Sequence, residues 1–163
     1  MRHLMILRHA KSSWADETMR DHERPLNKRG RHAAGAMGRF MAEEHLLPDF
    51  IISSDSTRTR ETVGLWSEGA AWDGDVDFRP ELYHASAGTL LEAARTAPET
   101  SNRIMLVAHN PGIEELVSRA AGRLVDMPTG TLAGFVLAGD SWSDVQVEAL
   151  SLAIHQRPRE LAD

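Results

Sequence analysis

The chain has 163 residues, of which 42% are hydrophobic and 26% charged, which is typical of one globular domain and not of a collagen-like, fibrous or disordered protein. It contains no cysteine, which excludes disulfides, thiolate zinc sites and cysteine nucleophiles. Because the formal net charge is −6 at pH 7, we expect no long-range attraction to nucleic acid, and any anion site has to be local.

The first ten residues contain one short apolar run, 4–7, which stops at Arg8 and His9. The run is too short for a signal-peptide core or a membrane span. We therefore expect a soluble, cytoplasmic protein without membrane partners. We also expect residues 1–155 to form a single domain and residues 156–163 a short, polar, frayed tail.

The first half of the chain alternates between strand and helix patterns. Residues 3–7 form the first predicted strand, and residues 30–46 carry apolar side chains at helical spacing. Residues 50–52 form a second strand, followed by a weaker helix over 56–70, whose glycines interrupt the pattern. This strand–turn–helix order is typical of parallel sheets with crossover helices.

The second half continues this order and then changes. A helix is predicted over about 90–97, a strand over 104–108 and a helix over 113–120. Residues 132–137 and 145–150 are predicted to form a hairpin at the sheet margin. The whole pattern predicts a three-layer α/β/α sandwich with a mostly parallel central sheet.

Polar residues follow the predicted strands where a ligand would bind. In open α/β sheets, ligands lie beyond the carboxyl ends of the strands, and there the sequence has Arg8, His9, Ser54, Arg58 and His109. Arginine forks match phosphate oxygens. A neutral histidine can attack phosphorus, and a cationic one can stabilise the developing charge. The pattern thus indicates metal-independent phosphoryl chemistry without a cofactor.

Five ordered segments resemble the motifs of one known family. Residues 7–14, 24–30, 53–62, 106–112 and 128–130 are similar to those of SixA-like phosphohistidine phosphatases, within the histidine phosphatase (phosphoglycerate mutase-like) superfamily. The resemblance covers roughly residues 1–137, and it implies a phosphoglycerate mutase-like fold.

The resemblance also assigns roles to individual residues. It implies His9 as phosphoryl acceptor, Arg8 and Arg58 as phosphate ligands, and His109 as the second histidine of the pocket. Ser54 stands where the superfamily has a serine before the arginine, and we expect it to bind phosphate. Many superfamily members have glycine where this chain has alanine after the histidine, a departure that SixA-like members share.

The resemblance implies a phosphatase that removes phosphate from phosphohistidine on a protein through a covalent intermediate on His9. Glu81 is the nearest counterpart of the general acid that ester-cleaving members use. Imidazole, with a pKa near 6.5, leaves with less acid assistance than an alcohol, so phosphohistidine is the favoured substrate. A phosphatase for small phosphomonoesters and a phosphate-sensing or phosphoprotein-binding module without turnover remain the alternatives.

Several other residues have plainer interpretations. Arg24 and Arg29 are interpreted as solvated charges at a helix start. Trp14 either anchors a turn on the core or contacts substrate. The remaining histidines lack the spacing of metal ligands, and the alternating Asp73, Asp75 and Asp77 are interpreted as a solvated turn before a strand.

Overall fold

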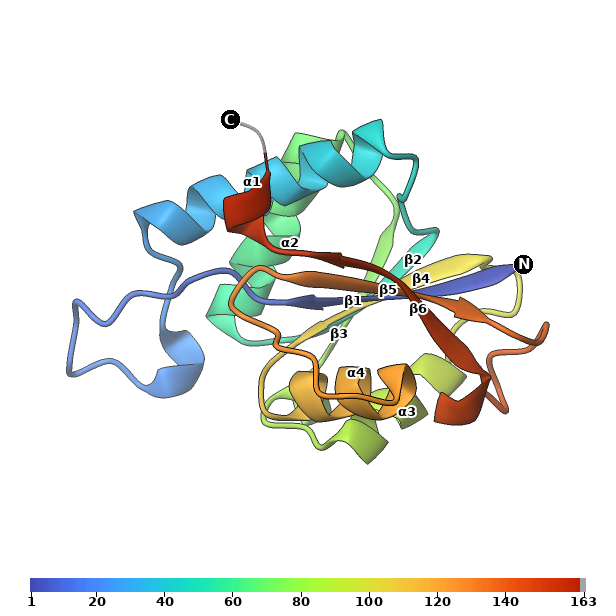
Figure 1. Cartoon of the computed structure of the whole chain (residues 1–163). Coiled ribbons are helices and arrows are strands. Elements are labelled where there is room, and N and C mark those ends of the chain that lie inside the picture. Colours follow the sequence, from blue (N-terminus) through green and yellow to red (C-terminus); the bar gives the residue numbers. More distant parts are fainter. Residues whose placement is uncertain (162–163) are drawn as a thin grey trace.

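The computed structural model describes residues 1–161, and its centre is a six-stranded sheet with the order β3-β2-β4-β1-β5-β6 (Figure 1). The pairs β1–β4, β2–β4 and β2–β3 are parallel, whereas β5 runs antiparallel to both β1 and β6. The strands are β1 (Arg2–Arg8), β2 (Phe50–Ser54), β3 (Asp75–Arg79), β4 (Arg103–Ala108), β5 (Leu132–Leu137) and β6 (Leu150–Gln156).

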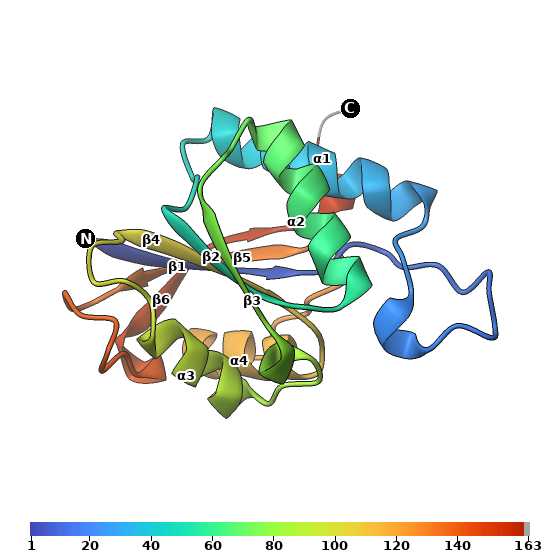
Figure 2. The same ribbon diagram turned by 180° about the vertical axis from the view of Figure 1, so that it is seen from behind.

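Two helix pairs cover the two faces of this sheet (Figures 1 and 2). Along β1, Leu4 and Ile6 belong to the core beneath α3 and α4, whereas Met5 and Leu7 belong to the core beneath α1 and α2. This alternation buries both faces of a central strand and confirms the three-layer α/β/α sandwich. The α-helices are α1 (Lys28–Glu43), α2 (Thr57–Ala70), α3 (Ala87–Arg95) and α4 (Gly112–Ala121); the short 3₁₀ helices are η1 (Asp21–Glu23), η2 (Pro80–Leu82), η3 (Val147–Ala149) and η4 (Pro158–Glu160).

Helix α2 forms although its apolar stripe is thin, because caps and close packing compensate. The Ser56 side chain accepts a hydrogen bond from the backbone N–H of Thr59, which caps the first turn. Trp66 is fully buried against the sheet. A Cβ on Gly69 would lie 2.1 Å from the carbonyl oxygen of Gly35 in α1, so the glycine that weakens the helical pattern is what lets the two helices touch.

The prediction of a strand over 145–150 is wrong, although β5 and β6 do form an antiparallel pair at the margin of the sheet. β6 begins only at Leu150, and residues 147–149 form η3. Trp142 and Val145 turn inward and join the core beneath α3 and α4, so the apolar residues before Leu150 cover the end of the sheet instead of pairing. β6 has one strand neighbour, and an edge strand can contain the polar residues His155 and Gln156.

The acidic segment after α2 also differs from its sequence interpretation. Asp75 and Asp77 lie within β3, the outer strand beside β2, and are not in a turn. The Asp77 carboxylate accepts a hydrogen bond from Nε of Arg79 at 2.7 Å. An edge strand exposes part of its length to water, which allows acidic side chains that a central strand would not allow.

The end of the described chain is more structured than expected. Pro158–Glu160 form η4, and Leu161 packs against the core beneath α1 and α2, so residues 156–161 are not a frayed tail. Residues 162 and 163 of the predicted tail lie outside the described residues. Across residues 1–161, no helix is long and apolar enough to cross a bilayer.

Candidate active site

Two histidines lie side by side at the edge of the sheet because each directly follows one of two neighbouring strands. β1 and β4 pair in parallel with Arg8 opposite Ala108, and His9 and His109 follow directly. The backbone N–H of His9 donates to the Ala108 carbonyl at 3.2 Å, and the centroids of the two histidine rings lie 5.1 Å apart. The carboxyl ends of the strands thus join residues that are far apart in the sequence.

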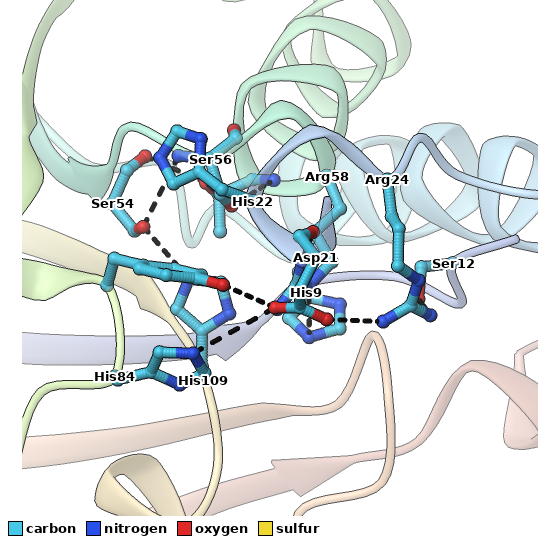
Figure 3. Close-up of polar contacts among 12 residues, drawn as sticks. His9, Ser12, Asp21, His22, Arg24, Ser54, Ser56, Arg58, His84 and His109 are labelled. Atoms are coloured by element: carbon cyan, nitrogen blue, oxygen red, sulfur yellow. Dashed lines mark hydrogen bonds and ion pairs between the residues drawn. The ribbon is translucent and has the colours of Figure 1, made fainter. Parts of the chain in front are cut away.

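A cavity of about 410 Å³ opens at this rim, and both histidines line it. Figure 3 shows their rings beside Arg58, Arg24 and Asp21. The lining comes from both histidine-bearing turns, the start of α2, the loop after β1 and the loop before β5. The lining residues are Arg8, His9, Lys11, Ser12, Trp14, Arg24, Arg58, His84, His109, Asn110, Pro128 and Thr129.

Two hydrogen bonds fix the tautomer of His9. Nδ1 lies 2.7 Å from the carbonyl oxygen of Ala10, and since a carbonyl only accepts, Nδ1 carries the proton. Nε of Arg58 then donates to Nε2 of His9 at 3.4 Å. His9 therefore has its lone pair on Nε2, the nitrogen beside the arginine.

The surroundings of His9 keep this ring neutral. The pKa of His9 is lowered to about 3, chiefly by burial and also by the positive charges of Arg58, Arg8 and Arg24, against the opposing hydrogen bond to Ala10. The ring is only 5% exposed, so protonation would place a cation in a low-dielectric site beside other cations. An unprotonated Nε2 is what a nucleophile requires.

Ser54 contacts His109 and does not line the cavity. The side chain of Ser54 is fully buried, and its Oγ lies 2.9 Å from Nε2 of His109. The structure thus brings Ser54 to the second histidine, and its direct contact with phosphate stays a prediction. Within residues 1–161, Nδ1 of His109 is buried without a hydrogen-bond partner.

His109 is not a permanent cation, contrary to the sequence expectation. The pKa of His109 is lowered to about 2, chiefly by burial and also by repulsion from His9, Arg58 and His84, against the attraction of Asp21. The protein's own groups thus leave both rings neutral at pH 7. Since the shift of His109 arises from burial and from neighbouring positive charge, an anion among these groups would reverse part of it.

Three arginines converge on the cavity. Arg8, at the end of β1, donates through one terminal nitrogen to the Met127 carbonyl at 3.1 Å, and its Nε is buried without a partner among the described residues. Arg58 lies in the first turn of α2 and is 5% exposed. Arg24 is 7% exposed, which corrects its interpretation as a solvated charge. The site therefore concentrates positive charge on an otherwise acidic chain.

The loop between β1 and α1 forms one wall of the cavity. Arg24 donates to Oγ of Ser12 at 2.5 Å and to the Ser13 carbonyl at 3.0 Å. Its guanidinium carbon lies 3.2 Å from the ring centroid of Trp14. The Trp14 ring is 75% exposed, so it stands at the mouth of the cavity and does not anchor a turn on the core.

Asp21 lies beside the cavity, and the sequence interpretation missed it. Its carboxylate accepts hydrogen bonds from Arg24 at 2.8 Å, from Arg58 at 3.1 Å and from the hydroxyl of Tyr83. Burial would raise the pKa of Asp21, but the bonds from Tyr83 and Arg24 and the charge of Arg58 outweigh it, so the pKa is lowered. Asp21 is therefore ionised at neutral pH and holds two arginines in position.

Two residues near η2 lie differently from expectation. Glu81 is exposed and is not part of the cavity lining, so the structure does not bring it to the other predicted site residues. His84 does line the cavity, with a positive φ of 57°, and its Nε2 lies 3.9 Å from the Asp21 carboxylate. No sequence signal marked His84, because it lies outside the strand-end motifs.

The titratable residues of the described part of the chain do not form a metal-ligand cluster. Within residues 1–161, no group of three or more His, Cys, Asp or Glu side chains could hold a metal ion. The polar groups that converge on the cavity are instead hydrogen-bond donors and cations, a set that fits an oxyanion.

Comparison with known proteins places these features in one family. A model of the histidine phosphatase superfamily (branch 1) matches residues 4–91, a stretch that includes Arg8, His9, Ser54 and Arg58. An uncharacterized chloroplastic protein of Arabidopsis thaliana is 38% identical over 155 residues, which cover 88% of this chain and 70% of that protein. An uncharacterized protein of Mycobacterium tuberculosis is 28% identical over 164 residues and is covered over its whole length.

Solved structures share the fold over nearly the whole chain. A candidate phosphohistidine phosphatase, SixA from Agrobacterium tumefaciens, has a TM-score of 0.81 and 28% identity and covers 96% of this chain and 98% of its own. A second SixA candidate, from Nakamurella multipartitia, has a TM-score of 0.83 and 27% identity and covers 96% of both chains. Since the family model covers more than half of the sequence and the Arabidopsis relative covers most of it, the chain belongs to branch 1 of the histidine phosphatase superfamily.

Proposed function

We propose that the protein is a metal-independent phosphatase that removes phosphate from phosphohistidine on a protein through a covalent intermediate on His9. One observation carries the proposal: Nδ1 of His9 is bound to the Ala10 carbonyl, so the lone pair is on Nε2, where it accepts a long hydrogen bond from Arg58. Membership of the histidine phosphatase superfamily and the SixA candidates of similar structure support phosphatase activity.

In the proposed first step, the lone pair of Nε2 forms a bond to phosphorus while the bond from phosphorus to the substrate's ring nitrogen breaks. The electron pair of that bond stays on the ring nitrogen, and the substrate ring, which carries a proton on its other nitrogen, leaves as neutral imidazole. In the second step, a water oxygen attacks the phosphoryl group on His9, the new P–N bond breaks, and the water proton and inorganic phosphate are released. The second step regenerates neutral His9.

Arg8 and Arg58 are proposed to bind the phosphoryl oxygens, with buried Arg24 adding positive charge at the mouth. Hydrogen bonds to charged groups contribute about 1.5–3 kcal/mol each, so several together offset the desolvation of a dianion. The unpartnered Nε of Arg8 fits such a role. It is a buried donor, and a buried donor without a partner is costly unless a ligand satisfies it.

His109 is proposed to donate from Nδ1 to a phosphoryl oxygen. In the neutral ring, a Ser54 hydroxyl that donates to Nε2 leaves the proton on Nδ1, the nitrogen without a protein partner. A bound dianion raises the pKa of His109, because opposite charge favours the protonated ring. The ring then adds a full charge as the transition state forms.

Among the described residues, no carboxylic acid lines the active-site cavity, which favours phosphohistidine over phosphate esters as the substrate. Asp21 is ionised and paired with Arg24 and Arg58, so it has no proton to give, and Glu81 lies outside the cavity lining. An alcohol leaving group needs a proton in the transition state. An imidazole, with a pKa of about 6.5, leaves without that assistance.

Turnover measurements on three substrates test the proposal. Phosphate release is compared for a phosphohistidine peptide, a phosphoserine peptide of the same sequence and a sugar phosphate, with His9→Ala as the inactive control. We expect kcat/KM to be highest for phosphohistidine by at least about a hundredfold, the contribution ordinarily supplied by one acid catalyst. A preference for either ester would identify the protein as a small-molecule or phosphoserine phosphatase.

Chemical trapping tests the intermediate separately. Rapid mixing with radiolabelled phosphohistidine peptide and an alkaline quench preserves P–N bonds, and peptide mapping should locate the label on His9. Tungstate binding by calorimetry shows whether His9→Ala still folds with an intact oxyanion site. Binding of tungstate by the unmodified protein without turnover or label on any substrate would instead support the sensing module.

A further inference from the structure

A second cavity adjoins the active-site cavity and is lined by cations. It has a volume of about 400 Å³ and shares Lys11, Pro128 and Thr129 with the active-site cavity. Arg29 from α1 and the arginines at positions 157 and 159 also line it, together with Ala33, Asp126 and Pro158. The two cavities therefore form one continuous depression that begins at the reacting histidines.

A third cavity, of about 480 Å³, extends this depression along α1. It shares Arg29, Pro158 and Arg159 with the second cavity and adds Lys28 and Arg39. We name the cationic residues of these two cavities the basic trough: Lys11, Lys28, Arg29, Arg39, Arg157 and Arg159.

The basic trough is rich in unpaired positive charge. It contains six of the 18 Lys and Arg residues of a chain whose net charge is −6. Among residues 1–161, Asp126 is the one carboxylate that lines it, and this side chain, 76% exposed, lies 3.7 Å from Arg157. Within residues 1–161, Lys11, Arg29 and Arg159 form no ion pair.

Close backbone packing fixes the trough to the catalytic rim. A Cβ on Gly30, in the first turn of α1, would lie 2.1 Å from the carbonyl oxygen of Lys11. A Cβ on Gly130 would lie 2.9 Å from the Pro158 ring and 3.9 Å from Cα of Ala10. Helix α1 thus packs tightly against the residues that follow His9, and η4 packs against Gly130, which borders Ala10, so the trough is preformed beside the site.

We propose that the basic trough docks an acidic polypeptide segment that flanks the phosphorylated residue of the substrate protein. The inference rests on the proposed function and names the substrate class more closely. Exposed arginines and lysines without partners fit the carboxylates of Glu and Asp. A continuous surface from trough to cavity lets one chain place its phosphoryl group at His9 while its acidic residues lie over Arg29 and Arg159.

The lining of the trough favours a polypeptide over a nucleic acid. The second and third cavities are lined by no Trp, Tyr or Phe in the described part of the chain, so they offer no platform on which bases could stack. The trough also ends at a cavity lined by Glu43, Glu44 and Glu160. Positive charge is therefore confined to the stretch beside the active site, which suits a short acidic segment.

Charge-reversed variants test the docking site with matched controls. The trough variant carries Arg29→Glu and Arg159→Glu. The control carries Arg119→Glu and Arg123→Glu, which change the net charge equally at exposed positions at the end of α4, on the other face of the sheet. Substrates are two phosphohistidine peptides that differ only in a flank of four glutamates or four glutamines, together with free phosphohistidine.

At low salt we expect the unmodified protein and the control to prefer the glutamate peptide at least about tenfold in kcat/KM. The trough variant should lose this preference while it turns over free phosphohistidine at the unmodified rate. Added salt should remove the preference, because screening weakens exposed charges. Equal turnover of both peptides by the unmodified protein would overturn docking and leave the proposed function intact.

A binding measurement tests the trough without turnover. Fluorescence anisotropy of a labelled, unphosphorylated glutamate peptide at low salt should show binding that the trough variant weakens at least about tenfold and the control does not. If the protein binds this peptide in the trough but hydrolyses none of the substrates, the proposed docking site stands and the proposed phosphatase activity is rejected. Absence of binding, or stronger binding of a single-stranded oligonucleotide of equal charge, would overturn the proposal.

Discussion

Oγ of Ser54 lies 2.9 Å from Nε2 of His109, and this contact joins the end of β2 to the residue after β4. The two strands are parallel neighbours in the sheet. Ser54 is fully buried, so it acts on the site through His109. The contact makes the orientation of the second histidine a consequence of strand pairing.

Replacing Ser54 by alanine should therefore affect catalysis more than binding. The Ser54→Ala variant loses the donor to Nε2, and we expect kcat to fall about tenfold, which corresponds to one lost hydrogen bond, with KM nearly unchanged. Nitrogen NMR shifts of His109 should show a change of tautomer that a merely structural role would not produce. Exposed Ser143→Ala is the control, and an unchanged kcat and tautomer in Ser54→Ala would contradict the positioning role.

Both catalytic-site histidines should titrate far below the ordinary range. The pKa of His9 is lowered to about 3 and that of His109 to about 2, in both cases chiefly by burial. Proton NMR, with signals assigned by their loss in His9→Asn and His109→Asn, should give midpoints below about pH 5, against an ordinary histidine pKa of about 6.5. Added tungstate should raise the midpoint of His109; a midpoint near 6.5 without it would refute the neutral pair.

The same shifts predict a loss of stability in acid. In the unfolded chain each histidine has a pKa of about 6.5, whereas folding lowers it, so the unfolded state binds more protons as the pH falls below this value. The free energy of unfolding therefore falls by up to about 1.4 kcal/mol per pH unit for each histidine between about pH 6 and pH 4.

Urea denaturation of His109→Gln measures this contribution. The variant should lose less free energy of unfolding between pH 6.5 and about pH 4.5 than the unmodified protein. The reason is that it lacks one histidine that binds a proton in the unfolded chain but not in the folded chain. Between pH 7 and 8 the two proteins should show the same pH slope, since the ring is neutral in both states. Parallel curves throughout the acid range would show that His109 titrates equally in the folded and unfolded chains.

Two variants of Asp21 should separate the effect of its negative charge on anion binding from the effect of the hydrogen bonds that position the arginines. Asn keeps one of the two acceptor oxygens that Arg24 and Arg58 use but removes one negative charge beside the cavity, so Asp21→Asn should bind tungstate about three- to tenfold more tightly. Asp21→Ala removes the acceptor as well and should bind it more weakly than the unmodified protein. Calorimetry measures both constants, and the same direction of change in the two variants would be inconsistent with a holding role.

Glu81 should be dispensable for phosphohistidine. Because it is exposed and does not line the cavity, Glu81→Gln should keep kcat/KM on a phosphohistidine peptide within about threefold, far less than the hundredfold effect of a general acid. Steady-state phosphate release measures the change. A loss of more than about a hundredfold would make Glu81 the acid catalyst and bring ester substrates back into consideration.

The sequence determined the central strands and the residues at their carboxyl ends. Buried strands of a parallel sheet are continuous apolar runs, and the polar residues after them, such as Arg8, His9 and His109, have to meet at one edge. The outer strands were harder to predict, because β3 and β6 face water along part of their length and their polar residues hide the pattern.

Only the tertiary structure decided how the convergent residues behave. Asp21 and Arg24 lie in and directly after the short helix η1, in a segment without a periodic signal, and only the folded chain brings them to Arg58. The protonation of His109 also depends on the fold. The side chains that bury its ring, and the charged groups near it such as Arg58, come from segments distant in the sequence. Residue types and local order are properties of the sequence, whereas burial and electrostatic environment come from the packing of the whole chain.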